Sequence, residues 1–132
     1  MNALGSHLLV EYSDCDEDIL NDVGLLEEAM KGAADRSGAT IVNSVFHLFH
    51  PHGVSGVVVI AESHFAIHTW PEYRFAAADF FTCGKNVASR SAIEFLRVVL
   101  KAGFCECKEI PRGKIGPSDG ALRHKPEALA MK

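Results

Sequence analysis

The chain has 132 residues, a length that fits one domain better than two. Hydrophobic residues make up 48% and charged residues 23%, with a formal net charge of −4, as in ordinary globular proteins. No Lys/Arg-rich block is present, which argues against a nucleic-acid partner. The longest apolar run, residues 53–61, is too short to span a bilayer, so we expect no membrane association. Residues 1–6 lack the features of a secretion signal, and a cytoplasmic protein is expected.

The amino-terminal third predicts a strand, a helix and a second strand. Residues 5–12 have a short β-compatible apolar core, and the acidic turn after them offers Asp16 or Asp18 as a helix cap. Apolar residues then recur at spacings of 4, 3 and 4, which predicts one amphipathic helix: Ile19, Val23, Leu26 and Met30. Gly38 is its expected stop, and residues 40–49 are rich in β-branched and aromatic residues typical of a strand.

The remaining elements are separated by Pro and Gly signals. A turn at residues 50–53 is followed by four further strands and one more helix. The predicted strands are 54–61, 65–70, 74–83 and 104–110, and the predicted helix is 88–102. Residues 113–132 show no periodicity and predict a flexible tail after a single domain of residues 1–112.

The predicted order is therefore β-α-β-β-β-β-α-β. Short turns between the middle strands make them antiparallel neighbours, and two helices most simply cover one face of the sheet. This predicts an α+β fold, a two-layer sandwich. Strands such as 54–60 are apolar on both sides, so a bare outer face would be sticky, and a homodimer that buries part of it is expected.

Cysteine and histidine patterns carry two further expectations. The four cysteines, Cys15, Cys83, Cys105 and Cys107, are expected to be free thiols because no export signal is present. Five histidines lie between residues 47 and 68, but we expect no metal site there. His47 and His50 are three apart on a strand and face opposite sides, while His50 and His52 lie in a turn.

Chemistry-bearing residues concentrate between residues 49 and 83, at strand ends and turns. The run ESHFAIHTWPEY at 62–73 resembles the processing-site motif of the bacterial and archaeal, pyruvoyl-dependent S-adenosylmethionine decarboxylase proenzymes. The segments DFFTCG at 79–84, FHPHGVSG at 49–56 and LGSHL at 4–8 extend the resemblance. It covers roughly residues 4–110.

The resemblance implies a protein that cuts its own backbone between Glu62 and Ser63, giving a β chain, 1–62, and an α chain, 63–132. Ser63 would become a covalent pyruvoyl cofactor that forms a Schiff base with the substrate amine. By the same resemblance, Ser55 assists processing by stabilising the oxyanion. His68 serves as the base that takes the Ser63 α-proton.

For the decarboxylation itself, the resemblance assigns Cys83 as the proton donor. Glu72 would bind the ribose hydroxyls and Phe49 would stack on adenine. The implied reaction converts S-adenosylmethionine to S-adenosylmethioninamine and CO2, which supplies aminopropyl groups for spermidine synthesis. A homodimer of αβ protomers is the expected assembly.

Two alternatives stay open at this point. The pyruvoyl chemistry could act on ornithine or arginine, or the chain could be a non-catalytic paralogue that binds a nucleoside or a partner subunit. Retention of Phe49 and Glu72 favours a nucleoside substrate. Arg74 departs from the family pattern, which often has a small residue such as glycine there, and an ion pair with Glu72 is one expectation for it.

Overall fold

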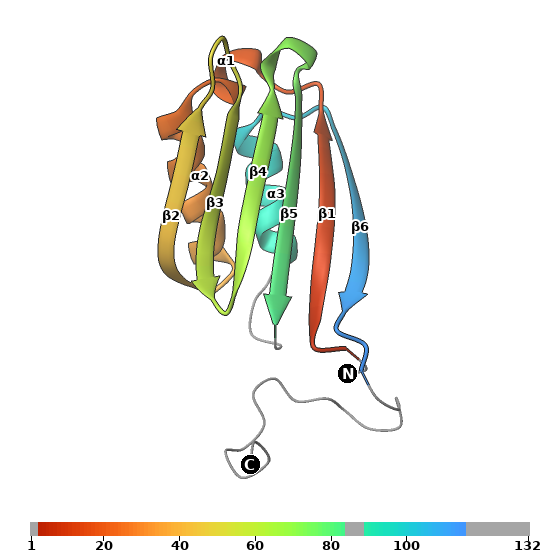
Figure 1. The fold of residues 1–132 in the computed structure, drawn as a ribbon. Coiled ribbons are helices and arrows are strands. Elements are labelled where there is room, and N and C mark those ends of the chain that lie inside the picture. The colour runs from red at the N-terminus through yellow and green to blue at the C-terminus, as the bar shows by residue number, and fades with distance from the viewer. Residues whose placement is uncertain (1–2, 84–88, 116–132) are drawn as a thin grey trace.

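A computed structural model describes residues 3–83 and 89–115, which form one six-stranded antiparallel sheet in the order β2-β3-β4-β5-β1-β6 (Figure 1). The strands are β1 Gly5–Ser13, β2 Thr40–Leu48, β3 Val54–Ala61, β4 Ser63–Trp70, β5 Phe75–Cys83 and β6 Phe104–Arg112. The helices are α1 Glu17–Leu20, α2 Val23–Arg36 and α3 Ser89–Val99, with a 3-10 turn η1 at Pro71–Tyr73. The predicted α+β class with an antiparallel sheet is confirmed, and the six strands follow one another along the chain as predicted.

The two long helices, α2 and α3, lie together on one face of the sheet (Figure 1). Alternate strand residues point toward them, as the two-residue period of a strand requires. Phe65, Ile67 and Phe80 are fully buried there, and the rings of Phe65 and Phe80 meet edge to face with centroids 4.7 Å apart. Leu26 and Leu96 complete this core from the helices.

The prediction of a single amino-terminal helix from the apolar spacing is wrong. A first helix ends at Leu20, and a second helix begins at Val23. Two aspartates explain the break. Asp16 accepts a hydrogen bond from the Ile19 backbone N–H at 3.0 Å, and Asp22 accepts one from Leu25 at the same distance. Each side chain caps its own helix, so Asp22 ends the first by beginning the second.

The predicted second helix is shorter than expected, since α3 ends at Val99 and Lys101 adopts a positive φ of 55°. Gly84 and residue 88, expected to end a strand and begin this helix, lie outside the described residues, as does the tail from residue 116. All four cysteines are free thiols, as predicted. Within residues 3–83 and 89–115, no helix has the length and apolar character needed to cross a membrane.

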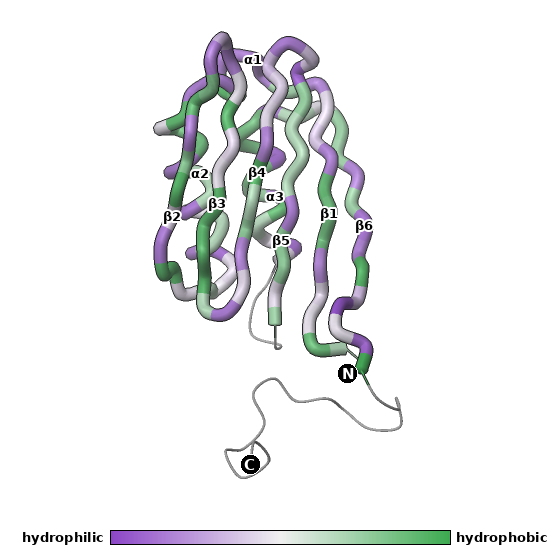
Figure 2. Tube along the Cα trace, viewed as in Figure 1, coloured by the Kyte–Doolittle hydropathy of each residue, from purple (hydrophilic) through white to green (hydrophobic). Residues whose placement is uncertain are grey.

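No element formed by residues 3–83 and 89–115 covers the face of the sheet opposite the helices (Figure 1). Large apolar side chains are exposed on it, among them Leu9, Val45, Val59 and Trp70. Figure 2 shows the long hydrophobic stretch of β3 that contributes to this surface. We call it the open face.

Candidate active site

The Glu62–Ser63 bond lies at the tip of the hairpin that joins β3 to β4. Ile60 pairs with Ser63 across the ladder, so Ala61 and Glu62 form a two-residue connection. The Ser63 Oγ atom is buried and has no hydrogen-bond partner within the described part of the chain. A buried hydroxyl without a partner is rare in folded proteins, and a catalytic role is one explanation for it.

Cys83 ends β5 beside this tip. Burial raises the pKa of its thiol above the ordinary value, and the nearby negative charge of Glu62 raises it further. The thiol therefore stays protonated around neutral pH. Gly5 of β1 pairs with Cys83, and a Cβ at Gly5 would come within 2.8 Å of the Thr82 carbonyl oxygen. Only glycine allows β1 to approach this closely.

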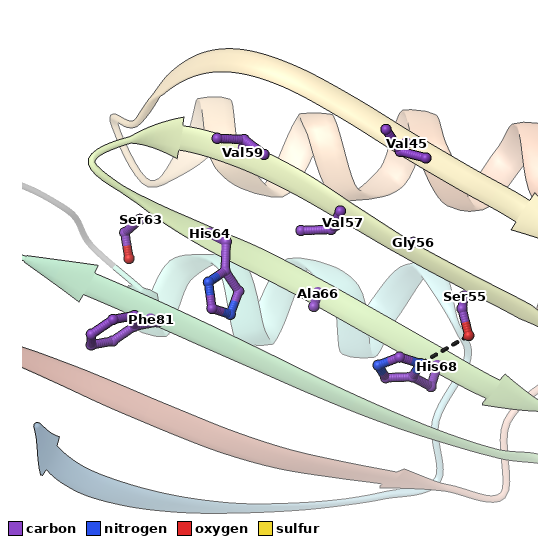
Figure 3. A pocket seen from close by; sticks show the side chains of 10 residues that line it. All are labelled: Val45, Ser55, Gly56, Val57, Val59, Ser63, His64, Ala66, His68 and Phe81. Carbon is purple, nitrogen blue, oxygen red and sulfur yellow. Dashed lines mark hydrogen bonds between the residues drawn. The ribbon is translucent and has the colours of Figure 1, made fainter.

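Ser55 and His68 form a second cluster on the open face. They are direct cross-strand partners on β3 and β4, and Ser55 Oγ lies 2.8 Å from His68 Nδ1 (Figure 3). This hydrogen bond joins the two residues that the resemblance assigns to the self-processing reaction.

The two clusters are separated within a single chain. His68 follows Ser63 by five residues on the same strand, which places it about 17 Å away at roughly 3.3 Å per residue. They lie at opposite ends of one broad hollow of about 750 Å³ on the open face (Figure 3). The hollow's middle is mostly apolar, and its lining comprises Val45, Ser55, Gly56, Val57, Val59, Ser63, His64, Ala66, His68 and Phe81.

The expected substrate-binding residues lie at the His68 end of the sheet. Phe49 follows β2 and is exposed, with its ring 4.6 Å from that of His47. Glu72 lies in η1, directly after β4, and its Oε1 is 3.0 Å from His52 Nε2. Both therefore group with Ser55 and His68, away from Ser63.

The expected ion pair between Arg74 and Glu72 is wrong. Arg74 ends η1 with a positive φ of 53°, which turns its side chain toward the loop after β1. Its Nε donates to the Cys15 carbonyl oxygen at 2.7 Å, and its Nη1 lies 3.2 Å from Asp14 Oδ1. Arg74 is thus a structural link rather than a partner of Glu72.

Three strands together build a cluster beside Ser63 that was not predicted from the sequence. His7 of β1, His64 of β4 and Asp79 of β5 bring their ligand-type atoms within 4.8 Å of one another. His7 is 72 residues away from Asp79 in the sequence and His64 is 15 residues away, so no local motif links the three. The signal that could have found them is the shared face that the strand register imposes.

Comparisons with known proteins agree on one family. The family model described as S-adenosylmethionine decarboxylase matches residues 6–113. The chain is 54% identical over 114 residues to a Thermotoga petrophila S-adenosylmethionine decarboxylase proenzyme, covering 86% of this chain and 88% of the relative. It is 43% identical to the proenzyme of Acidithiobacillus ferrooxidans, covering 98% of this chain and all of the relative.

A solved structure shares the architecture. The adenosylmethionine decarboxylase from Aquifex aeolicus superposes with a TM-score of 0.81 at 30% identity, covering 93% of this chain and all of that one. The chain therefore belongs to the S-adenosylmethionine decarboxylase family.

Proposed function

We propose that this protein cuts its own backbone between Glu62 and Ser63, converts Ser63 to a pyruvoyl group and then decarboxylates S-adenosylmethionine. The observation that carries the proposal is the buried Ser63 Oγ at a hairpin tip, which has no hydrogen-bond partner among the described residues and lies near Cys83, whose thiol pKa is raised. The names and the extent of the matching relatives support S-adenosylmethionine as the substrate, and with it the carboxy-lyase class.

Cleavage begins when Ser63 Oγ attacks the Glu62 carbonyl carbon and the amide becomes an ester. A base then removes the Ser63 α-proton, and elimination releases the Glu62 carboxylate as the new end of the β chain. Hydrolysis of the remaining dehydroalanine by water releases ammonia and leaves the ketone. This series of reactions needs a hydrogen-bond donor for the oxyanion and a base near Ser63. These are the roles expected for Ser55 and His68.

A single chain holds that donor and base about 17 Å from Ser63, so we propose that a second copy supplies them. Two copies packed open face to open face about a two-fold axis set the Ser63 end of one against the His68 end of the other. The apolar middle of the hollow would be buried between them. Each dimer then has two sites, each with Ser63 and Cys83 from one subunit and Ser55 and His68 of the partner subunit.

The same arrangement orders the substrate. The pyruvoyl group supplies a carbonyl that accepts the electrons released as CO2 leaves. Cys83, whose pKa is raised, holds a proton beside residue 63 for delivery to the substrate carbon. Phe49 and Glu72 of the partner subunit would hold the nucleoside, because they lie at the same end as His68.

Intact-mass measurement of the purified protein tests the cleavage. We expect two fragments, residues 1–62 and 63–132, the second lacking a free amino terminus and reactive toward hydrazine reagents. Ser63→Ala should remain one chain and release no CO2 from carboxyl-labelled S-adenosylmethionine. A wild-type protein that stays whole would contradict the proposal.

Mixing two inactive variants tests the shared site. Alone, neither His68→Ala nor Ser63→Ala should be cleaved. In a mixed dimer, the His68→Ala chain retains Ser63 and meets His68 of its partner, so that chain should be cut while the Ser63→Ala chain stays whole. If co-expression leaves both chains intact, the base does not come from the partner.

A further inference from the structure

A hydrogen-bonded cluster ties the residue after the scissile bond to two other strands. His64 Nε2 lies 3.0 Å from Asp79 Oδ2, and the same oxygen lies 2.7 Å from His7 Nε2. His7 and His64 both pair with Phe81 across their ladders, so the two rings flank Phe81 in one row. Their centroids are 5.9 Å apart. Asp79 lies two residues before Phe81 on β5 and interacts with both histidine side chains.

Arg112 fixes the proton positions in this cluster. Its Nη1 lies 2.9 Å from His7 Nδ1, and a guanidinium can only donate, so Nδ1 is an acceptor. The His7 proton is then on Nε2 and is donated to Asp79. His64 Nε2–H donates to the same carboxylate oxygen, which completes a chain from Arg112 through His7 and Asp79 to His64.

The contact between Arg112 and His7 also disfavours a metal ion bound by His7, His64 and Asp79. A metal on His7 Nε2 would move the ring proton to Nδ1, where it would face a donor of Arg112. Histidine ligands ordinarily donate that second N–H to a carboxylate or a carbonyl. In this structure the groups satisfy one another, so another role has to account for their position.

That position is next to the proposed cut. In the precursor, Ser63 is held from both sides by a continuous backbone. After cleavage it becomes the first residue of a strand, and strand ends fray unless they are tied down. Beyond the ladder pairing of Ser63 with Ile60, the side chain of His64 is the next tie, because it links the second residue of β4 through Asp79 to β5 and β1.

We propose that the His7–Asp79–His64 cluster is a clamp that holds residue 63 in place once the backbone has been cut. His64 is the positioning residue, and it acts through residue 63 rather than on the substrate. The inference rests on the proposed self-cleavage. The clamp matters little in the precursor and much in the cleaved enzyme, which separates it from a general stabilising network.

Two substitutions at His64 test the clamp, each made with Ser63 intact and in a Ser63→Ala chain that stays uncut. His64→Phe keeps a flat ring without a donor, whereas His64→Gln keeps an N–H of similar reach. We expect His64→Phe to be cleaved. Deuterium uptake at the amides of residues 65–69 should then rise in the cut protein and stay unchanged in the uncut one.

Kinetics supply the second measurement. In cleaved His64→Phe, kcat should fall by about 10- to 100-fold, since a misplacement of about 1 Å can cost on the order of 100-fold. KM should change by less than about twofold, and His64→Gln should recover most of the loss. Glu109→Gln, a matched change of carboxylate to amide on β6, should leave both measurements unchanged.

Asp79→Asn, which weakens the acceptor without altering His64, should reproduce the pattern of His64→Phe. Equal uptake changes in cut and uncut proteins, unchanged kcat, or failure of both variants to be cleaved would each overturn the clamp. These outcomes differ from failure of the proposed function, in which the wild-type chain itself remains whole.

Discussion

At the scale of single residues, Cys83 shows how position sets the chemistry of an ordinary thiol. Burial at the end of β5 raises its pKa, and the charge of Glu62 adds to the effect. A proton donor needs to be protonated when the substrate arrives, so this shift favours the donor role. The same two causes make a direct test possible.

Glu62→Gln removes the negative charge while keeping the side chain's size. The pKa of Cys83 should fall toward its ordinary value, because a nearby negative charge disfavours the thiolate. In an uncut Ser63→Ala background, the rise in the rate of Cys83 alkylation by iodoacetamide with increasing pH should therefore begin at a lower pH than it does with Glu62 present. Peptide mapping follows Cys83 apart from the other thiols, and an unchanged pH profile would remove Glu62 as a cause.

Gly5 provides a second prediction at this scale. A Cβ at this position would meet the Thr82 carbonyl oxygen at 2.8 Å and the Phe81 ring at 2.9 Å. Gly5→Ala should lower the free energy of unfolding by about 1–3 kcal/mol, as overpacking does, and should slow cleavage by shifting β1 away from Cys83. Urea denaturation and the rate of fragment appearance measure the two effects.

Gly24→Ala is the matched control for Gly5→Ala. Gly24 lies in the first turn of α2, where a Cβ meets nothing closer than Asp22 Oδ1 at 3.8 Å. Alanine is the better helix former, by up to about 1 kcal/mol. This variant should be at least as stable as the wild type, and cleavage should proceed normally.

At the scale of elements, the ends of strands and helices are set by individual polar contacts. Thr69 is buried in β4, donates to the Leu20 carbonyl oxygen at 2.7 Å and accepts from the Val54 backbone N–H at 2.9 Å. Asn21 accepts from the Gly53 backbone N–H at 2.8 Å. These bonds dock α1 against the turn that carries Phe49, so the short helix positions a proposed substrate residue.

Arg74 gives the prediction that belongs to this scale. Its positive φ favours glycine, while its side chain links η1 to Asp14 and Cys15. Arg74→Ala should lose the link and keep the strain, and should cost about 1–2 kcal/mol of unfolding free energy. Arg74→Gly loses the link but relieves the strain, so it should cost about 1 kcal/mol less than alanine does. Equal stabilities in urea would show that backbone strain is unimportant here.

At the scale of the whole molecule, the open face determines whether the protein can act alone. Apolar side chains are exposed across it, with Val45 at 62%. The two halves of the proposed site sit at its opposite ends. In a single chain the proposed nucleophile, Ser63, and the proposed base, His68, therefore lie about 17 Å apart.

Val45→Glu places a charge within the proposed interface. Association should weaken because an unpaired charge would be buried, and the variant should sediment as a monomer and remain uncleaved. Val98→Glu is the matched control, because Val98 is 59% exposed on α3 and lies on the helical side. It should sediment as a dimer and be cleaved. A dimeric, cleaved Val45→Glu protein would contradict the face-to-face assembly.

The sequence by itself determined the fold class and the order of the strands along the chain, and it indicated the segment that is proposed to carry the chemistry. Two-residue apolar alternation and short Pro/Gly turns are local signals, so β3, β4 and β5 were predicted within about two residues. The contiguous run from Glu62 to Tyr73 is also a local signal, and it carried the resemblance to the family. The helix break at Asp22 was misread because a cap competes with an apolar period that continues past it.

Only the tertiary structure decided which residues that are distant in the sequence lie close together in space. The cluster of His7, His64 and Asp79 exists because β1, β4 and β5 are neighbours in register, although they are far apart in sequence. The same register puts His68 next to Ser55 and carries it away from Ser63, since every residue along a strand adds about 3.3 Å. Distances across a sheet follow from long-range pairing, which no local pattern of residues encodes.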